Sequence, residues 1–390
     1  MTNASKYNKS RLKLLIKGLL PSILTLFGKR EQNLIVLNSF HNLQFNDNTK
    51  FLFEYLINNE GSYNVKYVIN DDTLREELIK KYGNFFIETN SVKGILYALK
   101  AKTWILNALE LPVSGVFLHF RRNVILLTHG VTSKQAGLAE MQVSMIKRLY
   151  YFIIRTNLSY VLTPCDEFKS IVASHFGVSA EKNMLVSGFP RFDPLLYGNY
   201  KKIEKKNNEI AILYAPTWRH YSDVKIFPFS DFNEIELEQF CHEHNIRIYL
   251  RVHPRFENRI PDSILKLSFV KLFSGKEYTD INEYLPNFDM LITDYSSIFY
   301  DFMILDRPLF FFMYDLEEYE KHIGLAVDFN KFAVGYKPTT QYEFLENLND
   351  ALERDRFAEK RQAVRKIACG DSLNNSKDLV ETLKEYKILC

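Results

Sequence analysis

The chain has 390 residues, and that length suits two domains of about 150–200 residues better than one. Hydrophobic residues make up 46% and charged residues 25%, which are globular values and exclude a disordered or fibrous chain. The formal net charge is only +3, whereas a general nucleic-acid binder is far more basic. The four cysteines show no paired spacing, so a reducing compartment is favoured over a disulfide framework or a zinc site.

Residues 1–30 differ from the rest of the chain because they carry seven basic side chains and no acid. Four of these share one stripe of a helix: Lys6, Lys9, Lys13 and Lys17. The least charged stretch, 18–28, is too short to span a bilayer, which takes about 20 apolar residues. We interpret 1–30 as a basic amphipathic segment lying on an anionic inner-leaflet surface. The alternative is an ordinary N-terminal helix packed on the first domain.

From residue 33 onward, short apolar runs alternate with longer amphipathic stretches. The runs are predicted as strands: Leu34–Leu37, Val65–Ile69, Phe85–Ile87, Trp104–Leu106, Val124–Thr128, Tyr160–Thr163 and Met184–Val186. The stretches between them are predicted as helices, including Thr49–Asn58, Thr73–Tyr82 and Lys134–Arg155. This alternation is typical of βα units on a parallel sheet.

A lysine-rich stretch, 198–209, interrupts the pattern and indicates a linker. The pattern then restarts with further predicted strands: Ile210–Tyr214, Ile246–Val252, Phe269–Phe273, Met290–Thr293 and Leu309–Phe312. The C-terminal stretch from 341 to 386 is predicted to be helical. We therefore expect two doubly wound α/β domains, with ligands at the carboxyl ends of the strands and in a cleft between the domains.

Reactive or anion-binding side chains follow five of the predicted strands. The segments concerned are His129-Gly130, Ser187–Asp193, Ala215–Arg219, Arg251–Arg255 and Asp294–Ser297. One such coincidence carries little weight, but five, divided between two domains, indicate function.

The turn Asp294–Ser297 opens a predicted helix, Ile298–Leu305. Ser296 and Ser297 can cap this helix and leave backbone N–H groups pointing outward, which suits a phosphate. A plain N-cap without a ligand is the alternative.

His129 and His253 each follow a strand, one in each domain. A histidine near its ordinary pKa can take a proton from a hydroxyl or donate to a phosphate oxygen. The other histidines lack this context and are assigned to the surface or the core. Four arginines are candidate phosphate ligands, and we expect two of them to be only surface ion pairs: Arg191, Arg219, Arg251 and Arg255. Trp218 and Tyr295 either stack on a base or pack in the core.

Several well-known motifs are absent from the sequence. It contains no P-loop, no G-x-G-x-x-G after a strand, no H-E-x-x-H and no G-x-S-x-G elbow. The carboxylate cluster of a metal-dependent nucleotide-sugar enzyme is not evident either. We therefore expect no central metal and no cofactor.

Taken in order, the motifs resemble those of the CDP-glycerol glycerophosphotransferase family, the teichoic-acid and capsule polyol-phosphate transferases. The segments that carry the resemblance are THG at 128–130, SGFPRFD at 187–193, YAPTWR at 214–219, RVHP at 251–254, ITDYSSIFYDF at 292–302 and RPLFFFMYD at 307–315. The resemblance covers about residues 120–330 and is weaker outside that range. It implies a GT-B-like fold of two Rossmann-type domains facing a central cleft.

The resemblance also implies the reaction and its residues. Glycerol phosphate, or a related polyol phosphate, passes from a CDP-activated donor to a hydroxyl of a lipid-linked or growing polymer, and CMP leaves. His129 and His253 correspond to the family's catalytic histidines, and we take His129 as the base, although the two roles could be exchanged. The donor phosphates are expected to contact Arg251, Ser296, Ser297, Thr217, Arg219 and Asp294.

The expected organisation divides the chain into five parts. These are the membrane-associating segment 1–30, an acceptor domain 31–198, the linker 199–209, a CDP-donor domain 210–370 and a C-terminal helix 371–390. An enzyme of this kind would be cytoplasmic and peripheral on the inner face of the plasma membrane.

The sequence departs from the family pattern in two places. Val131-Thr132-Ser133-Lys134 replaces T-P-L-K, and Ile323 stands where many members have an arginine. Two other functions remain open at this point. One is a GT-B nucleotide-sugar glycosyltransferase or UDP-sugar epimerase, and the other is a non-catalytic membrane-bound assembly protein.

Overall fold

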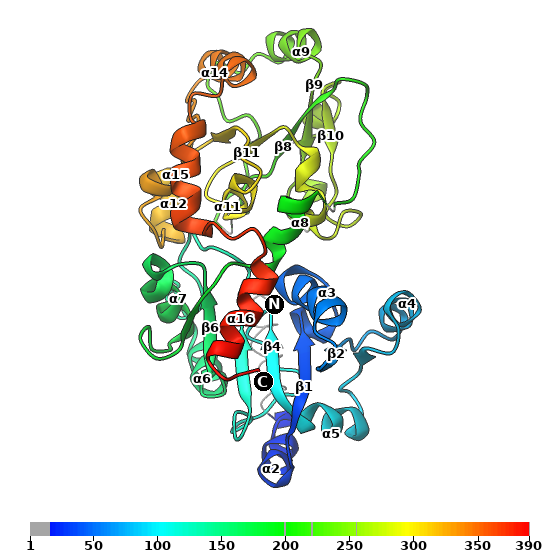
Figure 1. The fold of residues 1–390 in the computed structure, drawn as a ribbon. Helices are drawn as coiled ribbons and strands as arrows, with labels where there is room; N and C mark the ends of the chain where they lie inside the picture. The colour runs from blue at the N-terminus through cyan, green and yellow to red at the C-terminus, as the bar shows by residue number, and fades with distance from the viewer. Residues whose placement is uncertain (1–15, 199, 220, 255, 390) are drawn as a thin grey trace. The chain divides into compact units, whose positions relative to one another are not determined.

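The computed structural model describes residues 16–389 apart from 199, 220 and 255. The chain forms two compact units (Figure 1). Unit 1 comprises residues 1–131, 136–193 and 372–390, and unit 2 comprises 132–135 and 194–371. The stretch 199–209, expected as a linker, therefore lies within unit 2, and the C-terminal helix is part of unit 1.

Unit 1 is built on a seven-stranded parallel sheet of order β3-β2-β1-β4-β5-β6-β7. Its strands are β1 (Glu31–Asn38), β2 (Asn64–Val68), β3 (Phe86–Ile87), β4 (Ala101–Leu106), β5 (Asn123–Leu126), β6 (Tyr160–Thr163) and β7 (Met184–Val186). Its helices are α2 (Leu19–Phe27), α3 (Asp47–Asn59), α4 (Asp72–Tyr82), α5 (Val92–Lys100), α6 (Met145–Arg155), α7 (Lys169–Phe176) and α16 (Asn375–Glu385).

Unit 2 is built on a five-stranded parallel sheet of order β10-β9-β8-β11-β12. Its strands are β8 (Ile210–Tyr214), β9 (Ile246–Leu250), β10 (Val270–Leu272), β11 (Met290–Thr293) and β12 (Leu309–Phe311). Its helices are α9 (Glu234–Glu243), α10 (Asp262–Leu265), α11 (Ile298–Met303), α12 (Leu316–His322), α13 (Phe329–Phe332), α14 (Gln341–Glu353) and α15 (Ala358–Cys369), while α8 (Asp193–Tyr197) joins the two units.

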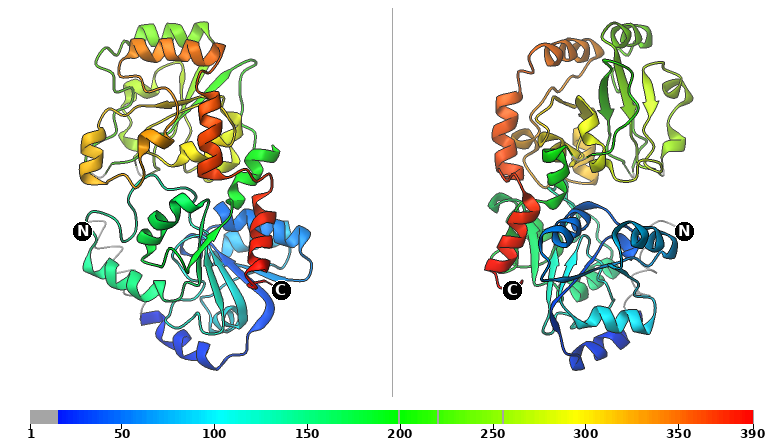
Figure 2. Two further views of the ribbon diagram at one scale, coloured as in Figure 1. Left: turned by 60° about the vertical axis from the view of Figure 1, so that its left-hand side comes forward. Right: turned by 45° about the vertical axis from the view of Figure 1, so that its right-hand side comes forward.

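Most of the strands form because they contain runs of apolar residues that are buried on both faces. Val36, Ile105 and Leu126 in unit 1 are fully buried, as are Ile212 and Ile292 in unit 2. A parallel sheet covered by helices on both faces favours such continuous apolar runs. In unit 2, α9 and α14 lie side by side (Figure 2).

The C-terminal helix α16 is tied to unit 1 through Asp193. The carboxylate of Asp193 accepts bonds from the backbone N–H of Asn375 and Ser376 at 2.7 and 3.0 Å. Ser376 Oγ donates a further bond to it at 2.5 Å. An acid at the start of a helix satisfies N–H groups that have no partner within the helix. The aspartate of the SGFPRFD motif therefore has a structural role.

The helix predicted over Lys134–Arg155 is wrong in its first half, because α6 begins only at Met145. Residues 133–135 are extended and pair with 324–326, and Gly137 has φ +63°. Neither conformation is compatible with a right-handed helix. Ser144 accepts a bond from Lys147 N at 3.2 Å and caps α6.

Each sheet has one point where its strand order reverses, between β1 and β4 in unit 1 and between β8 and β11 in unit 2. Ligands of open α/β sheets bind outside the carboxyl ends of the strands at such a switch point. In unit 1 the carboxyl end of β4 leads to Asn107, and in unit 2 that of β11 leads to Asp294.

Candidate active site

His129 lies just beyond β5 in unit 1, with its ring held on two sides. Its Nδ1 lies 3.2 Å from Asp47 Oδ2 and 3.3 Å from Asn107 Nδ2. The ring stacks on Phe40, with centroids 4.3 Å apart and planes at 16°. Because the Asp47 carboxylate can only accept a hydrogen bond from Nδ1–H, the tautomer that carries its proton on Nδ1 is favoured, and Nε2 becomes the basic nitrogen. The side chain is 44% exposed and is therefore accessible to a substrate.

Asp47 is the buried anion that orients His129, and sequence reasoning missed it. Burial opposes its ionisation, but the Arg191 guanidinium and the His129 hydrogen bond hold the pKa of Asp47 well below its ordinary value. Arg191 Nη1 lies 3.3 Å from Asp47 Oδ1 and is itself buried. Asp47 is thus a permanent carboxylate near pH 7, and Arg191 is engaged in a buried ion pair rather than offered to a phosphate.

The glycine after His129 is required for two reasons. Gly130 has φ +94°, which L side chains rarely adopt. A Cβ at this position would also lie 2.5 Å from Arg191 Nη2. Thr128 has φ +61°, so the strand ends before it, and Asn48 donates to its carbonyl at 3.0 Å. The THG turn therefore fixes His129 against the start of α3.

Residues Thr132–Gln135 belong to unit 2, although the chain on either side belongs to unit 1. Ser133 is buried, and its Oγ donates to the carbonyl of Tyr295 at 2.7 Å. Lys134 forms an antiparallel bridge with Leu325. Residues 133–135, which overlap the first departure from the family pattern, are thus hydrogen-bonded to 324–326, which directly follow Ile323 in unit 2.

Arg219 of unit 2 forms a buried ion cluster with two carboxylates. Its Nη1 donates to Asp294 Oδ2 at 2.9 Å, and its Nε and Nη2 donate to Asp315 at 2.6 and 2.7 Å. Burial opposes the charge of Asp315, but the bonds from Arg219 outweigh it and lower the pKa of this carboxyl. Since the Arg219 side chain has no exposed surface, it positions the turn and does not contact a phosphate in this conformation.

Asp294 joins the two loops that follow β8 and β11. Its Oδ1 accepts from Thr217 N at 2.8 Å and from Tyr295 N at 2.7 Å. Thr217 Oγ1 is buried and has no hydrogen-bond partner among the described residues. Ser296 Oγ accepts only a long 3.4 Å bond from Ile298 N, and the side chain of Ser297 makes no capping bond. Both serines are half-buried. Because the one capping bond is long and the other is absent, the expected role of these side chains in capping α11 is weak.

Arg251 differs from Arg191 and Arg219 because, within the described part of the chain, its guanidinium forms no close ion pair and, of the carboxylates, only Asp280 and Glu257 act on it electrostatically. Its Nη1 is buried without a partner among the described residues, and burial lowers the pKa of its guanidinium. The side chain lies over the Phe273 ring at 5.6 Å. A buried guanidinium of this kind favours an anionic ligand with a planar pair of oxygens.

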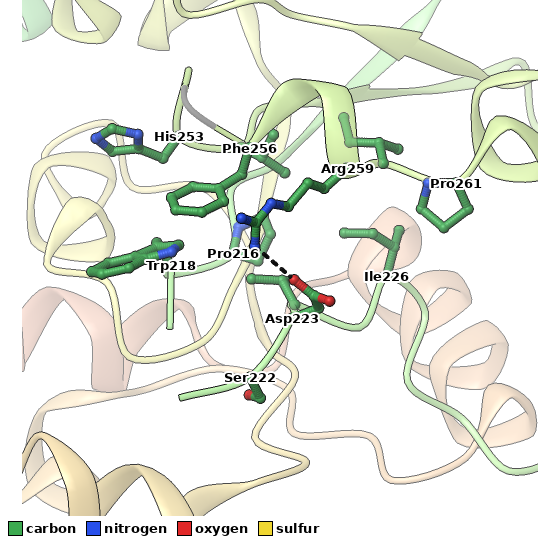
Figure 3. A pocket seen from close by; sticks show the side chains of 12 residues that line it. Pro216, Trp218, Ser222, Asp223, Ile226, His253, Phe256, Arg259 and Pro261 are labelled. Atoms are coloured by element: carbon green, nitrogen blue, oxygen red, sulfur yellow. Dashed lines mark hydrogen bonds and ion pairs between the residues drawn. The ribbon is translucent and has the colours of Figure 1, made fainter. Parts of the chain in front are cut away.

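His253 lines a pocket of unit 2 that Figure 3 shows from close by. Trp218 and Phe256 stack in its wall, with centroids 5.2 Å apart, and Arg259 pairs with Asp223 at 3.2 Å. His253 meets Phe256 edge to face at 5.8 Å. Tyr295, in contrast, is fully buried and stacks on Tyr319 at 4.0 Å, so it packs in the core.

The predicted site residues therefore lie in separate groups in the structure. Thr217, Arg219 and Asp294 come together, with Ser296 and Ser297 next to them in the chain, and Arg251 and His253 follow the adjacent strand β9. His129 stands in unit 1 with Asp47 and Asn107. Arg255 lies outside the described residues. Asp47 and Asn107 carry no sequence signal of their own, because an Asp before a helix indicates a cap.

Comparison with known proteins decides the family. Residues 22–384 match the family described as CDP-Glycerol:Poly(glycerophosphate) glycerophosphotransferase. The chain belongs to this family. It is a glycerophosphotransferase that uses CDP-glycerol, and the nucleotide-sugar and non-catalytic alternatives are not favoured.

Curated relatives agree with this assignment. A teichoic acid glycerol-phosphate transferase of Staphylococcus aureus is 28% identical over 342 residues, 83% of this chain and 85% of the relative. A teichoic acid poly(glycerol phosphate) polymerase of Bacillus spizizenii is 28% identical over 386 residues, 90% of this chain and 93% of the relative.

Solved structures support the fold. The wall teichoic acid polymerase TagF matches with a TM-score of 0.72 at 23% identity, covering 99% of both chains. A UDP-GlcNAc 2-epimerase from Neisseria meningitidis matches with a TM-score of 0.55 at 13% identity, covering 90% of this chain and 99% of the epimerase. The predicted GT-B-like pair of Rossmann-type units is thereby confirmed.

Proposed function

We propose that this chain adds glycerol phosphate from CDP-glycerol to a terminal hydroxyl of a lipid-linked teichoic acid chain and releases CMP. The hydroxyl would attack the β-phosphorus of the donor in line with the departing CMP. Both reactants are anionic, so the enzyme has to hold charge and position the groups. The observation that carries the proposal is the Asp47–His129 pair, a histidine with its Nδ1 side on a buried carboxylate.

His129 is the general base in this proposal. Asp47 keeps the proton on Nδ1, so that Nε2 takes the proton of the acceptor hydroxyl. As the hydroxyl proton moves, the imidazole gains charge, which the adjacent Asp47 carboxylate stabilises. A positioned base of this kind typically contributes about 10²–10⁴-fold to the rate. The Asp47 geometry favours His129 over His253 as the base.

The donor diphosphate is assigned to unit 2. Arg251 supplies the guanidinium, and Thr217, Ser296 and Ser297 supply hydroxyl and backbone donors around the start of α11. His253 would donate to the phosphate oxygens of the leaving CMP. Arg219 and Asp294 act through these residues as positioning groups, because they join the loops after β8 and β11.

A donor screen tests the proposal. The full chain is offered CDP-glycerol, CDP-ribitol and UDP-sugars together with a lipid-linked acceptor, and the product is weighed by mass spectrometry. We expect a mass increase of one or more glycerol phosphate units, with CMP formed in equal amount. His253→Ala should lower CMP release strongly, whereas His242→Ala, on the exposed face of α9, should not. Transfer of a sugar, or of no group at all, would overturn the proposal.

Two helices of unit 1 expose apolar side chains that would suit a lipid-linked acceptor. Within α2, Leu19, Ile23 and Phe27 are exposed, and within α6, Met145, Ile146, Leu149 and Phe152 are exposed. We call these residues the α2–α6 apolar surface. Both helices belong to unit 1, and Pro21 of α2 and Tyr150 of α6 line one cavity.

This surface is proposed to lie on the anionic inner leaflet of the plasma membrane. Lys17 and Lys29 flank α2 in the chain, and Arg148 lies within α6. Apolar contacts with the acyl boundary and basic contacts with anionic headgroups act together in such peripheral binding. Among the described residues, no helix is long and apolar enough to cross a membrane. The lysine stripe predicted within residues 1–15 lies outside the described residues.

A further inference from the structure

Two loops of unit 1 hold the ring of His129. The loop that follows β1 contains Phe40, whose ring stacks on the imidazole with centroids 4.3 Å apart. The loop that follows β4 begins at Asn107, whose Nδ2 lies 3.3 Å from His129 Nδ1 and 3.2 Å from Asp47 Oδ2. The orientation of the imidazole therefore depends on how these two loops are fixed to each other.

Neutral amide bonds join the two loops in part. Asn38, the last residue of β1, donates from Nδ2 to the carbonyl of Glu110 at 2.7 Å. Asn42 donates from Nδ2 towards the carbonyls of Leu111 and Pro112 at 3.2 and 3.3 Å. Because none of these amide groups titrates, the bonds between them do not depend on pH.

His41 and Glu110 join the same two loops through an ion pair. Nδ1 of His41 lies 2.9 Å from Oε1 of Glu110, and the backbone N–H of His41 donates to Oε2 of the same carboxylate. The side chain of His41 is 60% exposed and that of Glu110 is 23% exposed. One carboxylate thus bonds both the side chain and the backbone of the residue that follows Phe40.

The backbone at His41 has a conformation that needs such support. His41 has φ +54° and Asn42 has φ +59°, so two consecutive residues other than glycine lie in the left-handed region. This region is costly for residues that have a Cβ, and it persists where neighbouring groups over-determine the conformation. The bond from the His41 N–H to Glu110 is one such constraint. Removing it frees the loop, and Phe40 with it, to move relative to His129.

The groups around His41 decide its charge. The bond to Glu110 raises the pKa of His41 above its ordinary value of 6.5, although burial opposes the charge. Burial lowers the pKa of His175 to about 4, so that ring is neutral near pH 7. The two cavities that His41 helps to line have further titratable side chains in their walls, namely Lys17, His129, Glu140, Tyr150, Tyr151 and His175. The positive charge on His41 is therefore present at low pH and is lost as the pH rises through its folded pKa.

We propose that His41 and Glu110 are positioning residues, whose ion pair fixes the loop after β1 to the loop after β4 and so keeps the His129 imidazole oriented towards the acceptor hydroxyl. The inference rests on the proposed function, in which His129 is the base, and adds two residues that act through Phe40 and Asn107. Since His129 must be unprotonated to act and His41 must be protonated to pair, the two histidines set opposite pH limits on kcat.

Kinetics of the full chain test the pair. His41→Gln and Glu110→Gln each remove one charge, and the double variant removes both. Lys384→Gln breaks the pair with Glu60 at the other end of α3 and is the matched control. With CDP-glycerol and a soluble acceptor ending in glycerol phosphate both saturating, kcat of each single variant should fall about 2- to 5-fold, the scale of one partly exposed ion pair. The double variant should lose no more than either single variant, and the KM for CDP-glycerol should stay unchanged.

The pH profile separates positioning from a merely structural role. The ratio of kcat in the wild type to kcat in His41→Gln should be about 2–5 at about pH 6 and should approach 1 as His41 loses its proton. His41→Lys keeps a cation to higher pH, so it should retain part of the wild-type rate without this alkaline fall. The melting temperatures of all these variants should stay close to that of Lys384→Gln.

The outcomes distinguish this inference from the proposed function. If the wild type transfers glycerol phosphate and both single variants keep its kcat at every pH, the positioning pair is wrong and the proposed function stands. Losses that add in the double variant, or that come with a lower melting temperature and a higher KM for CDP-glycerol, would also overturn the pair. If the wild type transfers nothing from CDP-glycerol, the proposed function itself fails.

Discussion

Asp47 Oδ2 lies 3.2 Å from Nδ1 of His129, although 82 residues separate the two in the chain. The contact exists because Asp47 begins α3 with φ +58°, next to the turn that follows β5. Arg191 neutralises the other carboxylate oxygen. A buried carboxylate, an oriented imidazole and a half-exposed ring together give unit 1 a base that is ready before any substrate arrives.

Replacing Asp47 with Asn tests this orientation. The amide keeps the volume but removes the charge and allows the wrong imidazole tautomer. We expect kcat for CMP release to fall by about 10²-fold or more, on the scale of a positioned base. The KM for CDP-glycerol should hardly move. A variant with wild-type kcat would show that His129 does not need Asp47.

The Arg219 cluster should matter for stability as well as activity. Arg219→Leu leaves Asp294 and Asp315 buried without their cation, and breaking a buried pair in this way costs about 3–5 kcal/mol. The free energy of unfolding, measured with urea, should fall by that amount. Arg259→Leu removes the exposed pair with Asp223 and should cost about 0–1 kcal/mol. Equal losses in the two variants would argue against a structural role for Arg219.

Because of the same cluster, the free energy of unfolding should depend on pH in the acidic range. Because the folded state lowers the pKa of Asp315, its contribution is present above the unfolded value, near 4, and is lost as the pH falls through the folded value. The free energy of unfolding of the wild type should therefore exceed that of Asp315→Asn at pH 7. The gap should narrow between pH 5 and pH 3. A gap that stays constant over this range would contradict the assigned pKa direction.

The α2–α6 apolar surface predicts binding to anionic vesicles. Leu149→Glu combined with Phe152→Glu places two charges among exposed apolar side chains. We expect this variant to float poorly with vesicles that contain phosphatidylglycerol, and a chain lacking residues 1–30 to float less than the full chain. Ile235→Glu, an exposed apolar position on α9, should behave as the wild type. Equal flotation of all four proteins would remove the membrane assignment.

Much of the fold could be predicted because its strands are continuous apolar runs. Two predicted strands match the observed strands at both ends, namely Tyr160–Thr163 and Met290–Thr293. In both, the turn begins close to the last buried residue of the strand. The helix predicted over Lys134–Arg155 is too long at its N-terminal end, because helical periodicity carries no information about the pairing of Lys134 with Leu325. That pairing depends on a segment nearly 200 residues away in the sequence.

The residue types of the site could be predicted from the sequence, but the side chains that they contact could not. His129 and Asp294 could be found because they follow strands, and the topology makes such positions functional. Arg219 was expected on a phosphate because a sequence shows a guanidinium but not the two carboxylates beside it. Asp47 and Asn107 were missed since their roles arise only where segments that follow separate strands meet.

The most direct test of the central claim is the rate of CMP release by His129→Ala, with CDP-glycerol and acceptor both saturating. We expect a loss of about 10²–10⁴-fold, with CDP-glycerol binding by unit 2 preserved. Turnover close to that of the wild type would contradict the role of His129, because no other residue is proposed to take the acceptor proton.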